Sequence, residues 1–264
     1  DRSMPTTKRI PMPAPLVAPI LGGHLAKWFH WHAIFYVLMA MGLLCTFSVG
    51  RDVPETLQAE NRASINFSSV IKNFATILSH KATLGYVLAG GLSFAGMFSF
   101  LTSGSLVYIG LYGVSSEHFG YFFVMNIVIL MLMTFINGRV VMKIGSERML
   151  QIALGIQFSA GIWLAICGIF QLGLWPMAIG VAVFVGMMST IGSNAGAAIL
   201  ERYPHMAGTA NAVAGTMRFG IGSLVGAALS QVTLVTERPM LFSMAGCITC
   251  AVLIYYFFSY KNQS

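Results

Sequence analysis

Long apolar runs fill most of this 264-residue chain, and they limit more than any other feature what it can fold into. After a proline-crowded run at about residues 12–29, the runs lie at about residues 31–50, 83–111, 118–138, 149–171, 175–200, 209–235 and 239–260. About 20 apolar residues are enough for a helix to cross a bilayer. Only 9% of the residues are charged, against roughly 25% in soluble domains. We therefore predict an all-α, polytopic bundle of membrane helices.

One long polar passage, residues 51–81, interrupts these runs. Within its second half, apolar side chains recur at the spacing of one helical face, which predicts an amphipathic helix on the membrane surface or against the bundle. The apolar positions are Ile65, Phe67, Val70, Ile71, Phe74, Ile77 and Leu78. A chain of membrane spans broken once by a polar loop of about 30 residues suggests a transporter built from two helical halves.

The basic residues fall almost entirely on one side of the predicted membrane. Twelve of the 15 lie in the N-terminus, in alternate connections or after the last run, and only Lys27 and Arg238 lie in the opposite set. Because cytoplasmic loops collect Lys and Arg, we expect the polar loop and the C-terminus to be cytoplasmic. The same distribution accounts for the net charge of +7 without a nucleic-acid partner.

Cysteines and histidines do not form a recognisable chemical site. Cys247 and Cys250 form a C-x-x-C, but no second cysteine pair or nearby histidine completes a zinc set. His24, His30 and His32 cluster in an outer loop, where their spacing would allow a metal but their position also suits the membrane interface. We expect no metal and no cofactor, and no enzymatic role, because no acid–base cluster is apparent.

Arg218 is the only charged residue well inside a predicted span, while all eight acids lie in loops or at span ends. Asn211, seven residues earlier, and Gly222, one turn later, share its helical face. A buried arginine marks a substrate or coupling pathway, or it binds helix-end carbonyls and locks the bundle, and both interpretations stay open here. Asn126 and Asn137 share another face, as interhelical hydrogen-bond partners or as pathway residues.

Small residues recur at intervals of four in two predicted spans. They are Gly222 and Gly226 in one span, and Ser99 and Ser103 in the other. Small side chains let helices approach closely in lipid, so this spacing predicts helix-packing faces.

Several stretches resemble drug:proton antiporters of the major facilitator superfamily. Residues 18–23, APILGG, resemble the end of the antiporter motif G-P-x-x-G-G, with Ala18 in place of the first glycine. The stretches HWHAIFYVLMAMGLL, LSFAGMFSFLTSGSLVYI, FGYFFVMNIV and HMAGTANAVAGTMRFGIGSLVGA resemble the bicyclomycin-resistance (Bcr/CflA) branch. The resemblance implies that Pro19, Gly22 and Gly23 form a seam that seals the transport cavity.

A loop motif also resembles the superfamily, with one departure. In residues 138–148, Gly138, Lys143 and Gly145 fit the pattern G-x-x-x-D-R-x-G, but Met142 replaces its acid. The charge relay that this acid serves in the family is therefore in doubt in this part of the chain.

The resemblance implies a major facilitator fold of twelve helices, with most of the N-terminal half missing from this chain. Residues 1–50 would be the end of helix five and helix six, residues 51–82 the central cytoplasmic loop, and residues 83–264 helices seven to twelve. The implied activity is multidrug efflux at the bacterial inner membrane, exchanging small hydrophobic or amphipathic drugs for protons. A non-transporting fragment, and an uptake or metabolite transporter of the same fold, are the alternatives.

A proton-coupled exporter needs a group that gains and loses a proton within the membrane. No acid or histidine lies deep in a predicted span, and an arginine does not serve as a proton carrier. We therefore expect that this chain by itself does not perform proton-coupled export, and that the missing helices supply the proton site.

Overall fold

The computed structural model describes residues 25, 28–30, 32–52, 67–232 and 235–260. Most of these residues are helical, and the chain divides into two compact units, Asp1–Ser64 and Ile65–Ser264. In the part described, seven helices are long and apolar enough to cross a membrane, which confirms the predicted all-α membrane bundle.

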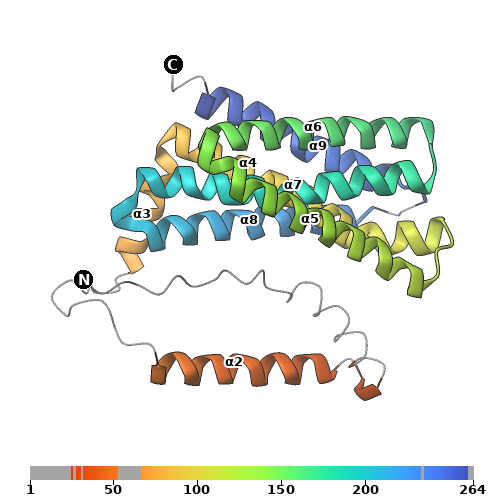
Figure 1. The fold of residues 1–264 in the computed structure, drawn as a ribbon, viewed down its shortest axis with the longest axis horizontal. Coiled ribbons are helices and arrows are strands. Elements are labelled where there is room, and N and C mark those ends of the chain that lie inside the picture. The colour runs from red at the N-terminus through yellow and green to blue at the C-terminus, as the bar shows by residue number, and fades with distance from the viewer. Residues whose placement is uncertain (1–24, 26–27, 31, 53–66, 233–234, 261–264) are drawn as a thin grey trace. The chain divides into compact units, whose positions relative to one another are not determined.

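The described part of the first unit contains one long helix, α2 (His32–Asp52) (Figure 1). Large apolar side chains on every side of α2 are exposed within its unit, among them Phe35, Leu38, Met41 and Leu44. A helix that is apolar all round is typical of a membrane span. Arg51 lies in its last turn, where a cation is stabilised by the helix dipole.

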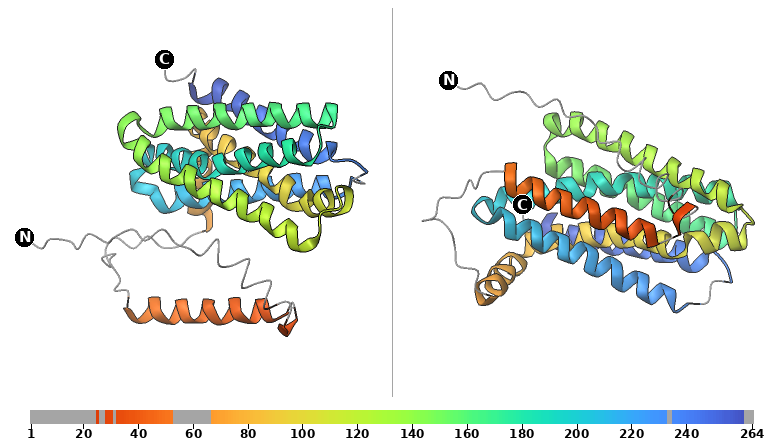
Figure 2. Two further views of the ribbon diagram at one scale, coloured as in Figure 1. Left: turned by 45° about the vertical axis from the view of Figure 1, so that its right-hand side comes forward. Right: turned by 90° about the horizontal axis from the view of Figure 1, so that it is seen from below.

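The second unit contains six long helices that run alongside one another (Figure 2). In chain order its elements are α3 (Phe67–Ser79), α4 (Lys81–Ser105), η2 (Leu106–Leu111), α5 (Ser116–Ile144), α6 (Ser146–Phe170), α7 (Leu174–Arg202), η3 (Pro204–Met206), α8 (Ala207–Ser230), α9 (Arg238–Tyr255) and η4 (Tyr256–Tyr260). The six long helices coincide with the six apolar runs after residue 82, so the predicted spans are confirmed.

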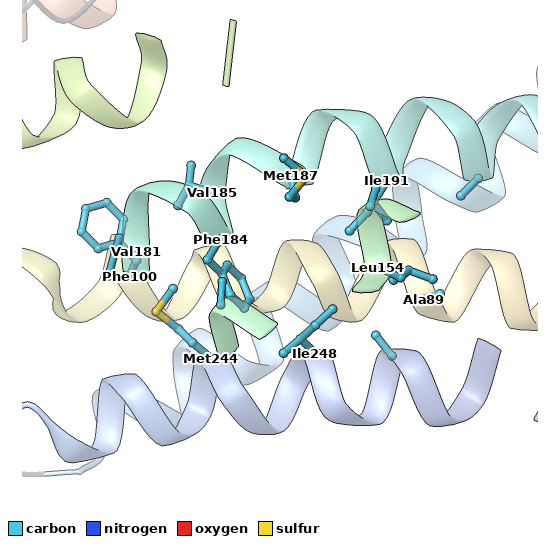
Figure 3. Close-up of a cluster of buried hydrophobic side chains, with 14 of the residues drawn as sticks. Ala89, Phe100, Leu154, Val181, Phe184, Val185, Met187, Ile191, Met244 and Ile248 are labelled. Carbon is cyan, nitrogen blue, oxygen red and sulfur yellow. The ribbon is translucent and has the colours of Figure 1, made fainter. Parts of the chain in front are cut away.

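Helix α4 lies at the centre of this bundle and packs against α7, α8 and α9. Helix α6 packs against α7 and α9, and α5 packs mainly against α7. The core between α4, α6, α7 and α9 is formed by buried apolar side chains, including Phe184, Leu154, Met244 and Ile248 (Figure 3). Contacts between α7 and α8 are few, and this sparse packing leaves space between the two helices.

Local sequence explains where the helices begin and end. The hydroxyl of Ser115 accepts a hydrogen bond from the backbone N–H of His118, at 3.3 Å, and caps the start of α5. A proline lies in the first turn of α9, where its missing N–H has no helical partner to lose.

The amphipathic helix expected within the polar passage is present as α3. Its residue Ile77 is fully buried, and α3 packs against α4 and α8. Val70 and Ile71 on the same helix are exposed. Of the two placements expected for this helix, contact with the bundle is therefore the one observed within this unit.

The loop expected over residues 138–148 is wrong in its extent. Helix α5 continues to Ile144, so Gly138 and Lys143 are helical, and the turn into α6 consists of Gly145 alone. Gly145 has a φ of 83°, a conformation that side-chain-bearing residues rarely adopt, and its N–H donates to the carbonyl of Val141 at 2.9 Å. The residues between the end of the apolar run at Gly138 and the turn at Gly145 include no helix breaker. The helix therefore continues beyond the apolar run, as far as Ile144.

Candidate functional site

A groove lies between α7 and α8 in the described part of the second unit. Its volume is about 620 Å³, and small residues dominate its walls. The groove is lined by Leu130 of α5, by Met188, Ser189, Gly192, Ser193, Gly196, Ala197 and Leu200 of α7, and by Asn211, Ala214, Gly215 and Arg218 of α8. A small adjoining hollow reaches Gly90 and Gly91 of the central helix α4.

Arg218 lies halfway along α8, eleven residues after Ala207 and twelve before Ser230. It is partly buried, and its guanidinium carbon lies 5.8 Å from the ring centre of Phe94 on α4. Within the described part of the chain, this guanidinium has neither a carboxylate partner nor a hydrogen bond. Because an arginine keeps its charge at physiological pH, the groove contains a fixed positive charge.

Asn211 shares the Arg218 face of α8, as the spacing of seven residues predicts, and both residues line the groove. Asn126 does not line it. That residue is buried in α5 with 3% of its surface exposed, and neither its amide nitrogen nor its amide oxygen has a hydrogen-bond partner among the described residues. The structure thus brings together two of the three candidate pathway residues and leaves the third elsewhere.

Polar side chains join α5 to α7 beside the groove. The amide of Asn194 donates to Asn137 Oδ1 and to the carbonyl of Thr190, at 2.7 Å each. Asn137 Nδ2 in turn donates to the hydroxyl of Ser193, at 3.3 Å, on the groove wall. Interhelical amide bonds of this kind hold spans together in lipid, and here they fix the α7 wall against α5.

The small residues predicted for helix packing lie at contacts of α4. A Cβ added at Gly222 or at Gly226 would come within 3.0 Å of Phe98 or Thr102, respectively, so each glycine allows close approach of α8 to α4. Ser99 shares a 2.7 Å hydrogen bond with Ser243 of α9. Ser103 is buried, and in the part of the chain that the structure describes its hydroxyl has no hydrogen-bond partner.

The turn after α5 shows what surrounds the position where Met142 replaces an acid. Met142 is 81% exposed. A few residues later, Glu147 accepts a 2.8 Å hydrogen bond from the hydroxyl of Tyr86 on α4, and Ser146 donates to Glu201 at 3.4 Å. Carboxylate contacts therefore join α6 to α4 and to α7 at this end of the bundle.

Two contacts in the six-helix unit, one at the groove and one in the bundle core, could not be predicted from single-residue patterns. Gly192 lies directly against the Arg218 guanidinium, and its place four residues before Gly196 was the available sign of an open helix face. Gln157 bridges Ser93 and the carbonyl of Phe184, and its polar side chain in an apolar run was the available sign of a buried contact.

Some predicted residues lie outside the described ranges. These are Pro19, Gly22 and Gly23 of the antiporter motif, and His24 of the outer histidine cluster. Among the described residues, no group of three or more His, Cys, Asp or Glu side chains is placed to hold a metal ion.

Comparison with known proteins assigns the family. Residues 14–227 match the model of the Major Facilitator Superfamily, so the chain belongs to this family, which is a family of transporters rather than an enzyme class. Together with the seven apolar helices, this makes the chain a multi-pass membrane protein.

Individual relatives place the chain within the bicyclomycin-resistance branch, as its motifs indicate. It is 49% identical to a bicyclomycin resistance protein homolog from Haemophilus influenzae, over 99% of this chain and 66% of that protein. It is 28% identical to a chloramphenicol resistance protein from Pseudomonas aeruginosa, over 91% of this chain and 56% of that protein. It is 27% identical to multidrug resistance protein D from Escherichia coli, over 82% of this chain and 54% of that protein. The chain thus spans just under two thirds, or less, of the length of these relatives.

Proposed function

We propose that this chain is part of a secondary active multidrug exporter that exchanges drugs for protons by alternating access. The observation that carries the proposal is the groove between α7 and α8, whose wall includes Arg218, a residue halfway along α8 that has no carboxylate partner among the described residues. The names of the relatives, which refer to resistance against bicyclomycin, chloramphenicol and multiple drugs, support export as its direction.

The groove has the size and lining of a small-molecule site. Such sites measure about 300–1,000 Å³ and combine apolar walls with a few polar groups, and the 620 Å³ groove falls in this range. Its polar groups are Arg218, Asn211, Ser189 and Ser193. A cation within a membrane span is expensive and is kept mainly where it faces a pathway. We therefore assign Arg218 and Asn211 to the substrate pathway, and small hydrophobic or amphipathic drugs as its ligands.

The proton site lies elsewhere in this proposal. The carboxylates of the six-helix unit lie at helix ends: Glu117 and Glu147 in first turns, Glu201 near the end of α7, and Glu237 just before α9. None of these four is near the middle of a described span, and Arg218 does not exchange protons. We propose that helices of the N-terminal half carry the proton, and that a pathway role of Asn126, which does not line the α7–α8 groove, would lie outside that groove.

The parts of the chain follow from this assignment. Residues 1–50 are proposed as the end of helix five and helix six, residues 51–82 as the central loop, and residues 83–264 as helices seven to twelve. Pro19, Gly22 and Gly23 would seal the cavity, because a proline bends a helix and glycines allow close packing. The proposed location is a bacterial inner membrane with the C-terminus in the cytoplasm, as the basic residues favour.

Resistance and proton flux test the proposal together. The complete gene product is expressed in a drug-sensitive strain, membrane insertion is verified, and the inhibitory concentrations of bicyclomycin and chloramphenicol are measured. The drugs are then added to energised inverted vesicles that report on their internal pH. The proposal predicts higher inhibitory concentrations and drug-triggered proton release. Unchanged inhibitory concentrations, or drug accumulation inside cells, would instead support an inert fragment or an uptake transporter.

A further inference from the structure

Gly192 leaves the space that the Arg218 guanidinium occupies. A Cβ added at Gly192 would lie 2.6 Å from Nη2 of Arg218, 3.2 Å from Cζ and 3.4 Å from Nη1. Gly192 is helical, and glycine weakens a helix, so the backbone itself gains nothing from it here. The residue is explained by the contact, because any side chain at this position would push the guanidinium out of its place.

Phe94 of α4 limits the position of the same group from another side. Its ring centre lies 5.8 Å from the guanidinium carbon, which is within the range of a cation–π contact. Phe94 is itself fixed by ring contacts with Phe98, at 5.3 Å, and with Phe219, at 5.1 Å. A glycine of α7 and an aromatic ring of α4 therefore position the guanidinium, and neither neutralises its charge.

A charge held in this way discriminates between ligands. A guanidinium presents five N–H donors and no acceptor, so it binds carbonyl, hydroxyl and carboxylate oxygens. It repels a cation, and the low dielectric of a membrane protein strengthens that repulsion. The other polar groups of the groove, Ser189, Ser193 and Asn211, carry no charge that could offset it.

We propose that Gly192 and Phe94 hold Arg218 as a fixed positive charge that makes the groove select uncharged or anionic, oxygen-bearing amphipathic ligands and exclude lipophilic cations. In this arrangement Arg218 determines specificity, and Gly192 is a positioning residue. The inference rests on the proposed function, since it names the substrate class of the same groove.

The first test compares a glycine of the groove wall with a glycine outside the groove, in the complete gene product. Gly192→Ala displaces the guanidinium, whose flexible side chain can move without unfolding the protein. Gly155→Ala is the control, because Gly155 is an exposed residue of α6 that does not line the groove, and an added Cβ there meets nothing within 4 Å. We expect bicyclomycin binding to weaken roughly tenfold in Gly192→Ala, as for loss of a charge-assisted hydrogen bond, and to stay within about twofold in Gly155→Ala.

The second test measures selectivity directly. Purified wild type, Arg218→Lys, Arg218→Gln and Arg218→Glu are titrated with bicyclomycin, an uncharged ligand, and with tetraphenylphosphonium, a lipophilic cation. We expect wild type to prefer bicyclomycin, Arg218→Lys to keep excluding the cation, and Arg218→Glu to bind the cation at least roughly tenfold more tightly than wild type. Arg218→Gln, which lacks charge but is still polar, should lose most of the discrimination.

The outcomes separate the inference from the function on which it rests. If wild type confers resistance and binds bicyclomycin, but the ratio of the two affinities is unchanged in Arg218→Glu, Arg218→Gln and Gly192→Ala, the inference is wrong and the exporter assignment stands. If correctly inserted wild type neither binds nor exports any drug, the proposed function and the inference both fail.

Discussion

The buried side chain of Gln157 provides a quantitative test of how the bundle is held together. Gln157 is fully buried in α6, where its Oε1 accepts a 2.7 Å hydrogen bond from the hydroxyl of Ser93 on α4. Its Nε2 donates to the backbone carbonyl of Phe184 on α7, at 2.9 Å. One amide therefore links three helices, and Gln157→Leu removes both links with a side chain of similar size.

The expected loss follows from the hydrogen bonds that are broken. Interhelical side-chain bonds in membrane proteins contribute about 0.6 kcal/mol each on average, so two bonds give about 1.2 kcal/mol. The Ser93 hydroxyl loses its partner as well, but a helical serine can return to the carbonyl one turn earlier, which limits the added loss. We therefore expect Gln157→Leu to lower the free energy of unfolding by about 1–2 kcal/mol.

A double-mutant cycle with Ser93→Ala separates the hydrogen bond from packing. Unfolding of the purified protein by dodecyl sulfate in mixed micelles is followed for wild type, both single variants and the double variant. In the Gln157→Leu background, Ser93→Ala should hardly change the free energy of unfolding, because the amide that accepts the Ser93 hydrogen bond is already absent. Wild-type stability in Gln157→Leu, or strictly additive effects of the two changes, would refute the three-helix link.

Two further predictions concern topology and the α5–α6 turn. In a variant without the native cysteines, Ser69→Cys and Asn262→Cys should not react with an impermeant maleimide added to intact cells, whereas Gln231→Cys should react, as the distribution of basic residues predicts. Labelling at Ser69→Cys or Asn262→Cys would show that the predicted membrane orientation is wrong. Gly145→Ala should lower the free energy of unfolding by about 1–3 kcal/mol because of its positive φ. Gly155→Ala, at an open helical position, should not lower the free energy of unfolding. If Gly145→Ala is as stable as wild type, the turn at Gly145 tolerates a side chain.

The number and order of the spans could be predicted from the sequence because lipid imposes one simple condition on each segment. A segment must be apolar over about 20 residues, and this property is local. The helix α3 and the shared face of Asn211 and Arg218 also follow from local spacing. The true end of α5 does not, because hydropathy falls after Gly138 while the backbone continues as a helix until Gly145.

Contacts between helices could not be predicted in the same way. Nothing in the residues around Gly192 indicates that Arg218 lies against it, because the two belong to helices that approach only in the folded bundle. The placement of Asn126 away from the groove, and the link from Gln157 to Ser93, depend equally on how helices are rotated about their axes. Spacing along one helix defines a face, but only packing decides what that face meets.

Protection of a cysteine in the groove tests the central claim most directly. Gly196→Cys places a thiol on the groove wall, and Ser159→Cys places one on the exposed face of α6, each in the complete gene product without native cysteines. Both are labelled with a permeant maleimide, with and without bicyclomycin at about ten times its measured dissociation constant. If the groove is the drug pathway, labelling at Gly196→Cys should slow roughly tenfold and labelling at Ser159→Cys should not change. Equal labelling rates at Gly196→Cys with and without bound bicyclomycin would contradict the account.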